Sequence, residues 1–387
     1  MDFEPSDEQR LLIDSARAFA SHELAPHAAD WDREHHFPVD TLRRAAAQGY
    51  AALYLDAADG GLGLSRLSAS LIFEQLAAGC VATAAYLTIH NMASWMLARF
   101  GDPALKAAWL PRLVSGELLA SYCLTEPDAG SDAAHLRTRA RRDGDDYVLD
   151  GTKSFISGAG ATQLLLVMAR TGDDPGARGI SCFLVEADAP GIRYGRNEVK
   201  MGWRAQPTRS IAFENVRVPA SQRIGPEGEG FVYAMRGLDG GRINIASCSL
   251  GAAQAALEQT HRYLGERRQF GRPLADFQAL QFRLADMLTA LVASRQMVRL
   301  AADRLDRAHP EASLYCAMAK RFATDHCFEV CNQALQLHGG YGYLNDYPLE
   351  RWVRDTRVHQ ILEGTNEIMR VIIARRLLAR DGPLDAL

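Results

Sequence analysis

Several features that would point to a particular partner or compartment are missing from this chain of 387 residues. Its longest apolar stretches, such as residues 164–169, are far shorter than the roughly 20 residues that cross a bilayer. The seven cysteines form no Cys-x-x-Cys pair and stand mostly in apolar runs, so we expect reduced core thiols. The formal net charge of -4 gives no reason to expect a nucleic-acid or membrane partner.

Targeting signals and general catalytic motifs are also scarce. The acidic N-terminus lacks the basic-then-apolar order of a secretory signal and the Arg-rich composition of an organellar presequence, which predicts a cytoplasmic location. His22-Glu23 and His27 are spaced one residue too widely for a zinc-protease helix, and Pro26 would disrupt that helix. Residues 60–63 lack the Lys-Ser/Thr of a P-loop, and no Gly-x-Ser-x-Gly elbow accompanies residues 338–340. We therefore expect neither a metal site nor hydrolase chemistry.

The length exceeds the size at which one hydrophobic core stops growing, so two or three domains are expected. Residues 1–118 have mostly helical patterns. Residues 119–230 carry short β-prone runs between Gly, Asp and Pro, and residues 231–387 carry long patterned stretches with few helix breakers. The sequence thus predicts an order of α, β and α domains, with the Pro/Gly-rich residues 225–230 as a boundary.

Local signals place some of the expected elements. Ser6 and Gln9 form a capping-box pattern before a helix, and Asp102-Pro103 gives an N-cap followed by proline at the first helical position. Asp150-Gly151 is typical of a tight hairpin turn. Long helices are expected over residues 239–265, 274–308, 311–337 and 365–380.

Four segments resemble the signatures of one enzyme family, the acyl-CoA dehydrogenases. They are residues 122–132, 267–271, 336–342 and 361–367, and they occur in the family's order and at its distances. The resemblance covers essentially the whole chain. It implies an α+β fold with an N-terminal helical domain, a middle β domain and a C-terminal four-helix bundle, and it implies an oxidoreductase that uses FAD.

Other segments favour one branch of that family. Residues 155–160, 236–246 and 357–360 are most similar to the members that oxidise isobutyryl-CoA to methacrylyl-CoA in valine breakdown. Butyryl and 2-methylbutyryl groups remain alternative substrates, because a methyl or methylene changes binding in an apolar pocket by only about 1–3 kcal/mol. The resemblance also implies a homotetramer that passes electrons to electron-transfer flavoprotein.

The implied base is Glu363. Removal of a weakly acidic α-hydrogen needs a positioned carboxylate and an acceptor for the β-hydride. Glu363 matches the family position for this carboxylate, where burial would raise its pKa. Some relatives place the base directly before the arginine that corresponds to Arg242, and here that position is Gly241. The resemblance therefore leaves Glu363 as the base.

The resemblance also implies the residues that contact FAD. In the β domain they are Tyr122, Leu124, Thr125, Ser131, Phe155, Ile156 and Ser157. A neighbouring subunit's FAD would meet Arg267, Phe270, Gln278, Gln336, Leu337, His338, Gly339 and Gly340. Thr365, Asn366 and Glu367 would complete the site, although Thr365 or Asn366 could instead cap a helix.

The CoA thioester is expected to meet a smaller set. Asp239 and Arg242 match positions near the pantetheine and adenine, Ser131 would also reach the pantetheine, and Arg375 could contact CoA or only solvent. Trp203 would lie beside the flavin or in the core. Two alternatives remain: a flavin oxidase or monooxygenase on the same fold, and a non-catalytic descendant that serves as an assembly factor or nucleic-acid binder.

Overall fold

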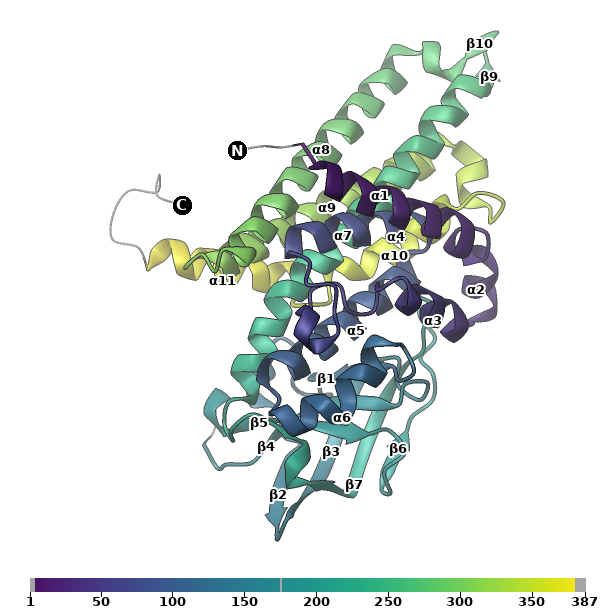
Figure 1. The fold of residues 1–387 in the computed structure, drawn as a ribbon. Helices are drawn as coiled ribbons and strands as arrows, with labels where there is room; N and C mark the ends of the chain where they lie inside the picture. Colours follow the sequence, from purple (N-terminus) through teal and green to yellow (C-terminus); the bar gives the residue numbers. More distant parts are fainter. Residues whose placement is uncertain (1–3, 175, 380–387) are drawn as a thin grey trace.

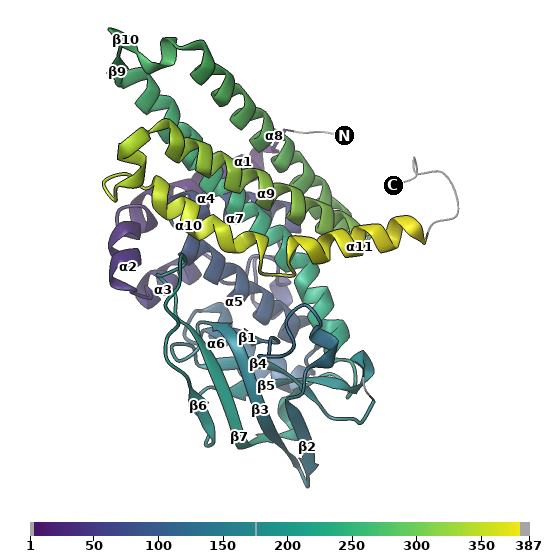
Figure 2. The same cartoon turned by 180° about the vertical axis from the view of Figure 1, so that it is seen from behind.

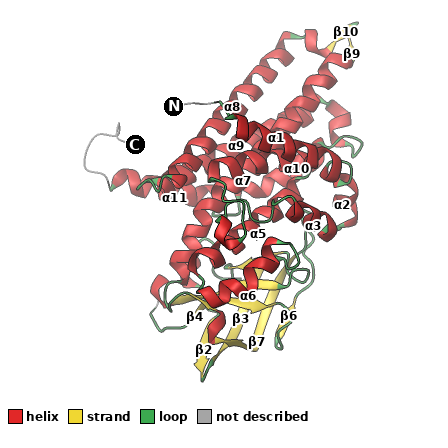
Figure 3. Cartoon of the chain, in the orientation of Figure 1, coloured by secondary structure: helices red, strands yellow, loops and turns green. Residues whose placement is uncertain are grey.

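The computed structural model describes residues 4–174 and 176–379. The strands gather at one end of the molecule, and helices from both ends of the sequence make up the rest (Figure 3). The α, β, α order and the α+β fold class predicted from the sequence are confirmed. Among the described residues, no helix is long and apolar enough to cross a membrane.

The first region is helical. Its helices are α1 (Asp7–Phe19), the π-helical turn η1 (Ala20–Leu24), α2 (Ala28–Glu34), α3 (Val39–Ala47), η2 (Ala57–Asp59), α4 (Arg66–Gly79), α5 (Val81–Phe100) and α6 (Pro103–Val114). The predicted capping box is present, because Ser6 Oγ accepts from Gln9 N at 3.2 Å and Gln9 Oε1 accepts from Ser6 N at 3.0 Å. Asp102 caps α6 by accepting from Leu105 N at 2.8 Å, as predicted.

The middle region is a sheet of eight strands. They are β1 (Ala120–Cys123), β2 (Arg139–Asp143), β3 (Asp146–Ser157), β4 (Leu164–Arg170), β5 (Ile180–Glu186), β6 (Ile192–Tyr194), β7 (Thr208–Pro219) and β8 (Arg223–Ile224), with 3-10 turns η3 (Ala133–His135), η4 (Ala177–Gly179) and η5 (Ala220–Gln222). The strand order is β6-β7-β3-β2-β4-β5-β8, and β1 pairs with β4 in parallel. Because β1 also packs against α5, the loop after β1 leaves the sheet next to the helical regions (Figure 1).

The predicted hairpin turn at Asp150-Gly151 is wrong. Both residues lie inside β3, where Gly151 has φ +148° next to a register shift against β7. A Cβ on Gly151 would stand 2.6 Å from Thr138 Cα, so this glycine marks a close approach of two backbones. The turn between β2 and β3 instead contains Gly144, whose φ of +62° a glycine adopts without strain.

The third region consists of long helices. They are α7 (Gly230–Glu266), α8 (Gln278–Asp306), α9 (Ala312–Leu337), α10 (Leu349–Arg357) and α11 (Asn366–Leu378), joined by β9 (Arg268–Gln269), β10 (Arg272–Pro273) and the 3-10 turns η6 (Leu274–Asp276), η7 (Gly339–Tyr343) and η8 (Val358–Gln360). Helices α7, α8 and α9 pack on one another, and α10 and α11 lie against α9 (Figure 2). The four long helices predicted from the sequence are confirmed within a few residues, except that α7 begins at Gly230, and α10 was not predicted.

The cysteines are all buried and free, which confirms the prediction of reduced core thiols. They are Cys80, Cys123, Cys182, Cys248, Cys316, Cys327 and Cys331. Burial raises the pKa of each thiol. These groups therefore pack as small apolar side chains.

Candidate active site

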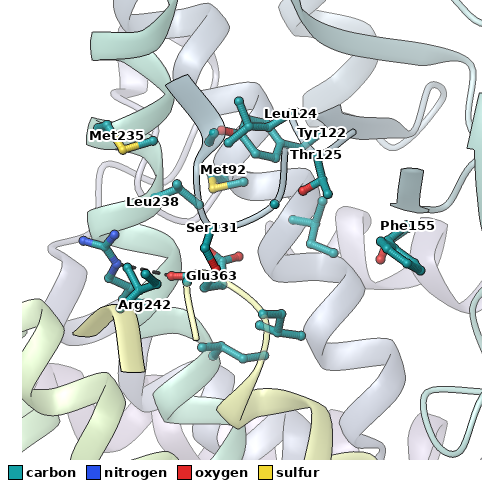
Figure 4. Close-up of a pocket in the computed structure, with 18 of the residues that line it drawn as sticks. Met92, Tyr122, Leu124, Thr125, Ser131, Phe155, Met235, Leu238, Arg242 and Glu363 are labelled. Carbon is teal, nitrogen blue, oxygen red and sulfur yellow. Dashed lines mark hydrogen bonds between the residues drawn. The ribbon is translucent and has the colours of Figure 1, made fainter. Parts of the chain in front are cut away.

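A cavity of about 360 Å³ lies where the three regions meet. Its wall combines α5, the loop after β1, the end of β3, the first half of α7, and the loop and helix after residue 361. Predicted site residues from five separate parts of the sequence line this central cavity: Tyr122, Leu124, Thr125, Ser131, Phe155, Ile156, Ser157, Trp203, Arg242 and Glu363. Figure 4 shows most of them around one space.

Glu363 extends from a tight turn into this cavity. The backbone is left-handed at both Glu363 (φ +58°) and Gly364 (φ +87°), a conformation that a glutamate rarely adopts and that is common at functional sites. Although the residue is only half-buried, its Oε2 atom is enclosed and has no hydrogen-bond partner among the described residues. Burial raises the pKa of Glu363 to about 7, against the opposing charges of Arg242 and Lys320. This carboxyl is therefore poised to exchange a proton near neutral pH.

The absence of a side chain at Gly241 makes room for that carboxylate. A Cβ built on Gly241 would stand 2.3 Å from Glu363 Oε2 and 2.9 Å from Glu363 Cδ. Real Cβ atoms essentially never come so close to another atom. Any larger residue on α7 at this position would therefore push the Glu363 carboxylate out of its place.

Arg242 supports the same turn from α7. Its Nε donates to the Glu363 carbonyl oxygen at 3.3 Å (Figure 4). Its Nη1 donates to Asp239 Oδ1 at 2.7 Å. Arg242 lines the central cavity, whereas Asp239 is not among the lining residues and accepts a second hydrogen bond, from Ser313. Asp239 therefore orients Arg242, and Arg242 faces the space that a ligand would fill.

A buried ion pair holds the loop after β1. Lys153 Nζ on β3 donates to Glu126 Oε1 at 2.8 Å and to the Leu124 carbonyl at 3.0 Å. The Glu126 carboxylate also accepts from Arg137 N at 2.6 Å and Thr138 N at 2.9 Å. Burial opposes the charged form of Glu126, but Lys153 and these backbone donors outweigh it and lower the pKa of the carboxyl. The pair thereby fixes the loop that carries Leu124, Thr125 and Ser131.

Replacing Lys153 with methionine is expected to destabilise the protein by about 3–5 kcal/mol, because it leaves Glu126 as an uncompensated buried charge. The measurement is urea-induced unfolding at pH 7. Arg139→Met is the matched control, since its partner Asp173 is almost fully exposed and such surface pairs contribute about 0–1 kcal/mol. Equal effects of the two substitutions would contradict a structural role for the buried pair.

Two aromatic residues at the cavity wall have left-handed backbones. Phe155 (φ +58°) is 71% exposed, which is unusual for a large apolar side chain beside a cavity. Trp203 (φ +51°) is buried, donates from Nε1 to His359 Nε2 at 3.2 Å, and has its backbone N–H on Asp355 Oδ1 at 2.6 Å. The core position predicted as one alternative for Trp203 is therefore confirmed. Trp203 also lines the cavity, and its place beside a flavin stays a prediction.

A second group of predicted residues lies outside the central cavity. Arg267, Phe270 and Gln278 lie at the tip between α7 and α8, at the opposite end of the molecule from the sheet (Figure 1). Phe270 is 92% exposed, and Gly339 and Gly340 have open space around them. The end of α9 and the turn after it hold the others: Gln336, Leu337, His338, Gly339 and Gly340.

Aromatic contacts join the two parts of this second group. Tyr263 on α7 stacks on the His338 ring with 4.2 Å between centroids, and the Arg267 guanidinium lies 5.6 Å from the Tyr341 ring centre. The structure therefore brings most of the predicted FAD residues into two groups, one at the central cavity and one at the adjoining ends of α7, α8 and α9.

The residues after the turn at Glu363 and Gly364 mainly hold α11. Thr365 Oγ1 accepts from Ile368 N at 3.3 Å, so Thr365 is the helix N-cap that the sequence left as an alternative. Asn366 is buried, and its amide contacts Lys320, Thr324 and Asp325. Glu367 and Arg375 are exposed on α11 and are not among the residues that line the central cavity.

Sequence reasoning missed several residues of the site. Met92, Leu238, Ile245, Leu362 and Ile368 give the cavity its apolar wall. Lys153 and Lys320 are fully buried cations beneath the loops that carry the predicted residues. A single lysine within an apolar helical run, as at Lys320 in residues 317–320, was an available signal, because lysine is almost never fully buried unless it is paired.

Comparison with known proteins gives the same assignment along the whole chain. Family models described as the N-terminal, middle and C-terminal domains of acyl-CoA dehydrogenase match residues 6–117, 121–216 and 228–378. The chain is 55% identical over 373 residues to "Isobutyryl-CoA dehydrogenase, mitochondrial" of Bos taurus, a match that covers 96% of this chain and 89% of that protein.

Solved structures show the same fold. Butyryl-CoA dehydrogenase from Megasphaera elsdenii superposes with a TM-score of 0.94 at 37% identity, covering 98% of this chain and 100% of that one. An FAD complex of PigA superposes with a TM-score of 0.95 at 31% identity, covering 98% and 100%. The family predicted from four sequence segments is confirmed, as is the oxidoreductase class. The chain belongs to the acyl-CoA dehydrogenase family.

Proposed function

We propose that the protein removes two hydrogens from the α and β carbons of a short branched acyl-CoA, with Glu363 as the base and FAD as the cofactor. The observation that carries the proposal is the Glu363 carboxyl, which extends into an apolar cavity, lacks a partner for Oε2 and has a pKa raised to about 7. Apolar surroundings strengthen a carboxylate as a base, since the charged form is poorly solvated there.

The residues around the central cavity fit a flavin. Phe155 offers an exposed apolar face, while Thr125 and Ser157 bring hydroxyl groups that can donate to or accept from the polar edge of a planar ring. FAD, when bound, supplies an acceptor for the β-hydride. The Glu363 carboxylate takes the α-proton, and Arg242 and the Glu126–Lys153 pair keep the surrounding loops in place.

Isobutyryl-CoA is the proposed substrate and methacrylyl-CoA the product, as in valine breakdown. Support comes from the 55% identity to a relative named for isobutyryl-CoA and from the apolar side chains of Met92, Leu238 and Leu362 around the base. We also propose that electron-transfer flavoprotein accepts the electrons. Butyryl-CoA and 2-methylbutyryl-CoA remain the nearest alternatives.

A homotetramer is proposed as well. Apolar side chains on the outer face of α8, namely Phe282, Leu288 and Val292, are exposed in the single chain and would be covered by neighbouring subunits. The separate group around Arg267 and His338 would then contact the FAD of another chain. The cytoplasmic location remains a prediction from the sequence.

The pH dependence of turnover follows from the pKa of Glu363. The base must be ionised, and burial raises its pKa to about 7, so kcat/KM is expected to fall about tenfold per pH unit below that value and to level off above it. The measurement is kcat/KM for isobutyryl-CoA between about pH 5.5 and 8.5. The fall of kcat/KM at low pH is the acidic limb of this profile. An acidic limb centred near the pKa of an ordinary glutamate, about 4.3, would contradict a desolvated base.

The proposed reaction is tested by product analysis. Purified protein is incubated with isobutyryl-, butyryl-, 2-methylbutyryl- or isovaleryl-CoA and an artificial electron acceptor, and the thioesters are examined by mass spectrometry. The expected result is that the thioesters lose two hydrogens, and that isobutyryl-CoA is oxidised fastest when all four are compared at the same low concentration. Preference for another thioester would change the substrate and keep the reaction, whereas rapid oxygen consumption without the acceptor would favour a flavin oxidase. No oxidation of any thioester would contradict the dehydrogenase.

A further inference from the structure

The catalytic turn is held by two buried cations that come from different helices. Arg242 Nε on α7 donates to the carbonyl oxygen of Glu363 at 3.3 Å. Lys320 Nζ on α9 donates to the next carbonyl, that of Gly364, at 2.8 Å. Two consecutive carbonyl groups of one turn are thus each bonded to a basic side chain, and both side chains are buried.

The turn needs such support because its backbone is strained. Glu363 has a left-handed φ of +58° without being a glycine, and such residues persist only where the surrounding structure enforces them. Gly364 continues the turn at φ +87°. Its carbonyl points to Lys320, so release of that hydrogen bond would free the peptide that follows the base.

Lys320 also joins the turn to the helix after it. Its Nζ donates to Asn366 Oδ1 at 2.9 Å, and the Asn366 amide nitrogen donates to Thr324 Oγ1 at 2.9 Å and Asp325 Oδ1 at 2.6 Å. Lys320, Thr324 and Asp325 lie within about one and a half turns of α9. A single buried side chain therefore connects α9 both to the turn and to the first residue of α11.

We propose that Lys320 is a positioning residue for the reaction, which holds the Gly364 carbonyl and thereby aims the Glu363 carboxylate into the central cavity. The inference rests on the proposed function only in that Glu363 is the base. Lys320 does not line the cavity, so its effect on the reaction passes through the turn.

Its charge should have a second, separable effect. The charged groups that act on Lys320 are Glu363, Arg242, Asp325 and Glu367, and those that act on Glu363 are Arg242 and Lys320. Burial lowers the pKa of Lys320 to about 7, while the charge of Glu363 opposes this. The positive form of Lys320 in turn lowers the pKa of Glu363. Loss of that charge should move the acidic limb of kcat/KM to higher pH.

The test compares Lys320→Met with Lys320→Gln, which keeps a hydrogen-bond donor without the charge. Lys106→Met is the control, since Lys106 pairs with Asp59 and neither residue is among the charged groups that act on Glu363 or Lys320. In flavin-bound, substrate-free protein, we expect amide hydrogen exchange in residues 361–369 to rise about tenfold or more in Lys320→Met and to be unchanged in residues 250–262 of α7. The acidic limb should move to higher pH in both Lys320 variants and stay in place in Lys106→Met.

The outcomes separate this inference from the proposed function. Exchange needs no turnover, so faster exchange confined to residues 361–369 would support the positioning role even if no acyl-CoA were oxidised. Unchanged exchange together with an unchanged pH profile would overturn it. A uniform rise in exchange across α7, α9 and α11, or failure of both Lys320 variants to fold, would assign Lys320 to general stability and would also overturn the positioning role.

Discussion

Glu363→Gln is expected to lower kcat for isobutyryl-CoA by about 100- to 10,000-fold, which is the usual contribution of a positioned general base. Glutamine has nearly the size of glutamate but cannot take up the α-proton. Because Glu363 Oε2 has no partner within the described residues, the substitution breaks no existing hydrogen bond of that atom. The loss should therefore come from chemistry and not from a collapsed site, and kcat should fall more than KM rises.

Two control measurements compare Glu363→Gln with wild type: the amount of bound flavin and the thermal stability. A carboxyl whose pKa is raised on folding makes the folded state less stable at pH values above its unfolded pKa, an effect that is complete above the folded pKa of about 7. Replacing it should leave the protein at least as stable as wild type at pH 8, and the gain should shrink as the pH is lowered toward 5. Thermal unfolding at the two pH values measures this. A variant that keeps its flavin and turns over normally would remove Glu363 from the proposed role.

Gly241→Ala is the second variant with a large expected effect. The new Cβ would stand 2.3 Å from Glu363 Oε2, so the carboxylate must move by an ångström or so. A displacement of about 1 Å from productive geometry can cost about 100-fold in rate. We expect kcat to fall by about this factor while the protein remains folded, because alanine is the best helix former and α7 continues on both sides.

Gly265→Ala is the matched control, since Gly265 lies on the same helix and an added Cβ would meet nothing within 4 Å. That control should keep full activity and a slightly higher unfolding temperature. Combining Gly241→Ala with Glu363→Gln should reduce kcat little beyond Glu363→Gln alone, because both changes act on the same carboxylate. Independent, multiplicative effects of the two substitutions would show that Gly241 acts elsewhere.

The sequence predicted which residue is the proposed base, but it did not predict the backbone conformation or the surroundings of that residue. Glu363 could be named because a short segment resembles a family signature, but its left-handed backbone and enclosed Oε2 depend on contacts with α7 and α9. The glycine at position 241 was noticed only as a missing carboxylate. Its steric role required the distance to Glu363, which is 122 residues away in the chain.

The errors also have physical causes. Asp150-Gly151 has the local chemistry of a tight turn, yet pairing of β3 with β2 and β7 on both sides overrides that preference and uses the glycine at a backbone crossing. Helix α10 was not predicted because no N-cap side chain marks its start at Leu349. Lys153 stands among the polar residues 152–154 and resembles a surface lysine in the sequence, whereas the apolar run before Lys320 was a signal of burial that was not used.

The most direct test of the account is an anaerobic titration of the flavin-bound protein with isobutyryl-CoA, followed by the visible absorbance of the flavin, in wild type and in Glu363→Gln. Wild type is expected to lose the flavin absorbance within seconds, whereas Glu363→Gln should bind the thioester and keep the absorbance. Loss of absorbance at similar rates in both proteins, or no loss in wild type with any short acyl-CoA, would contradict the proposed reaction.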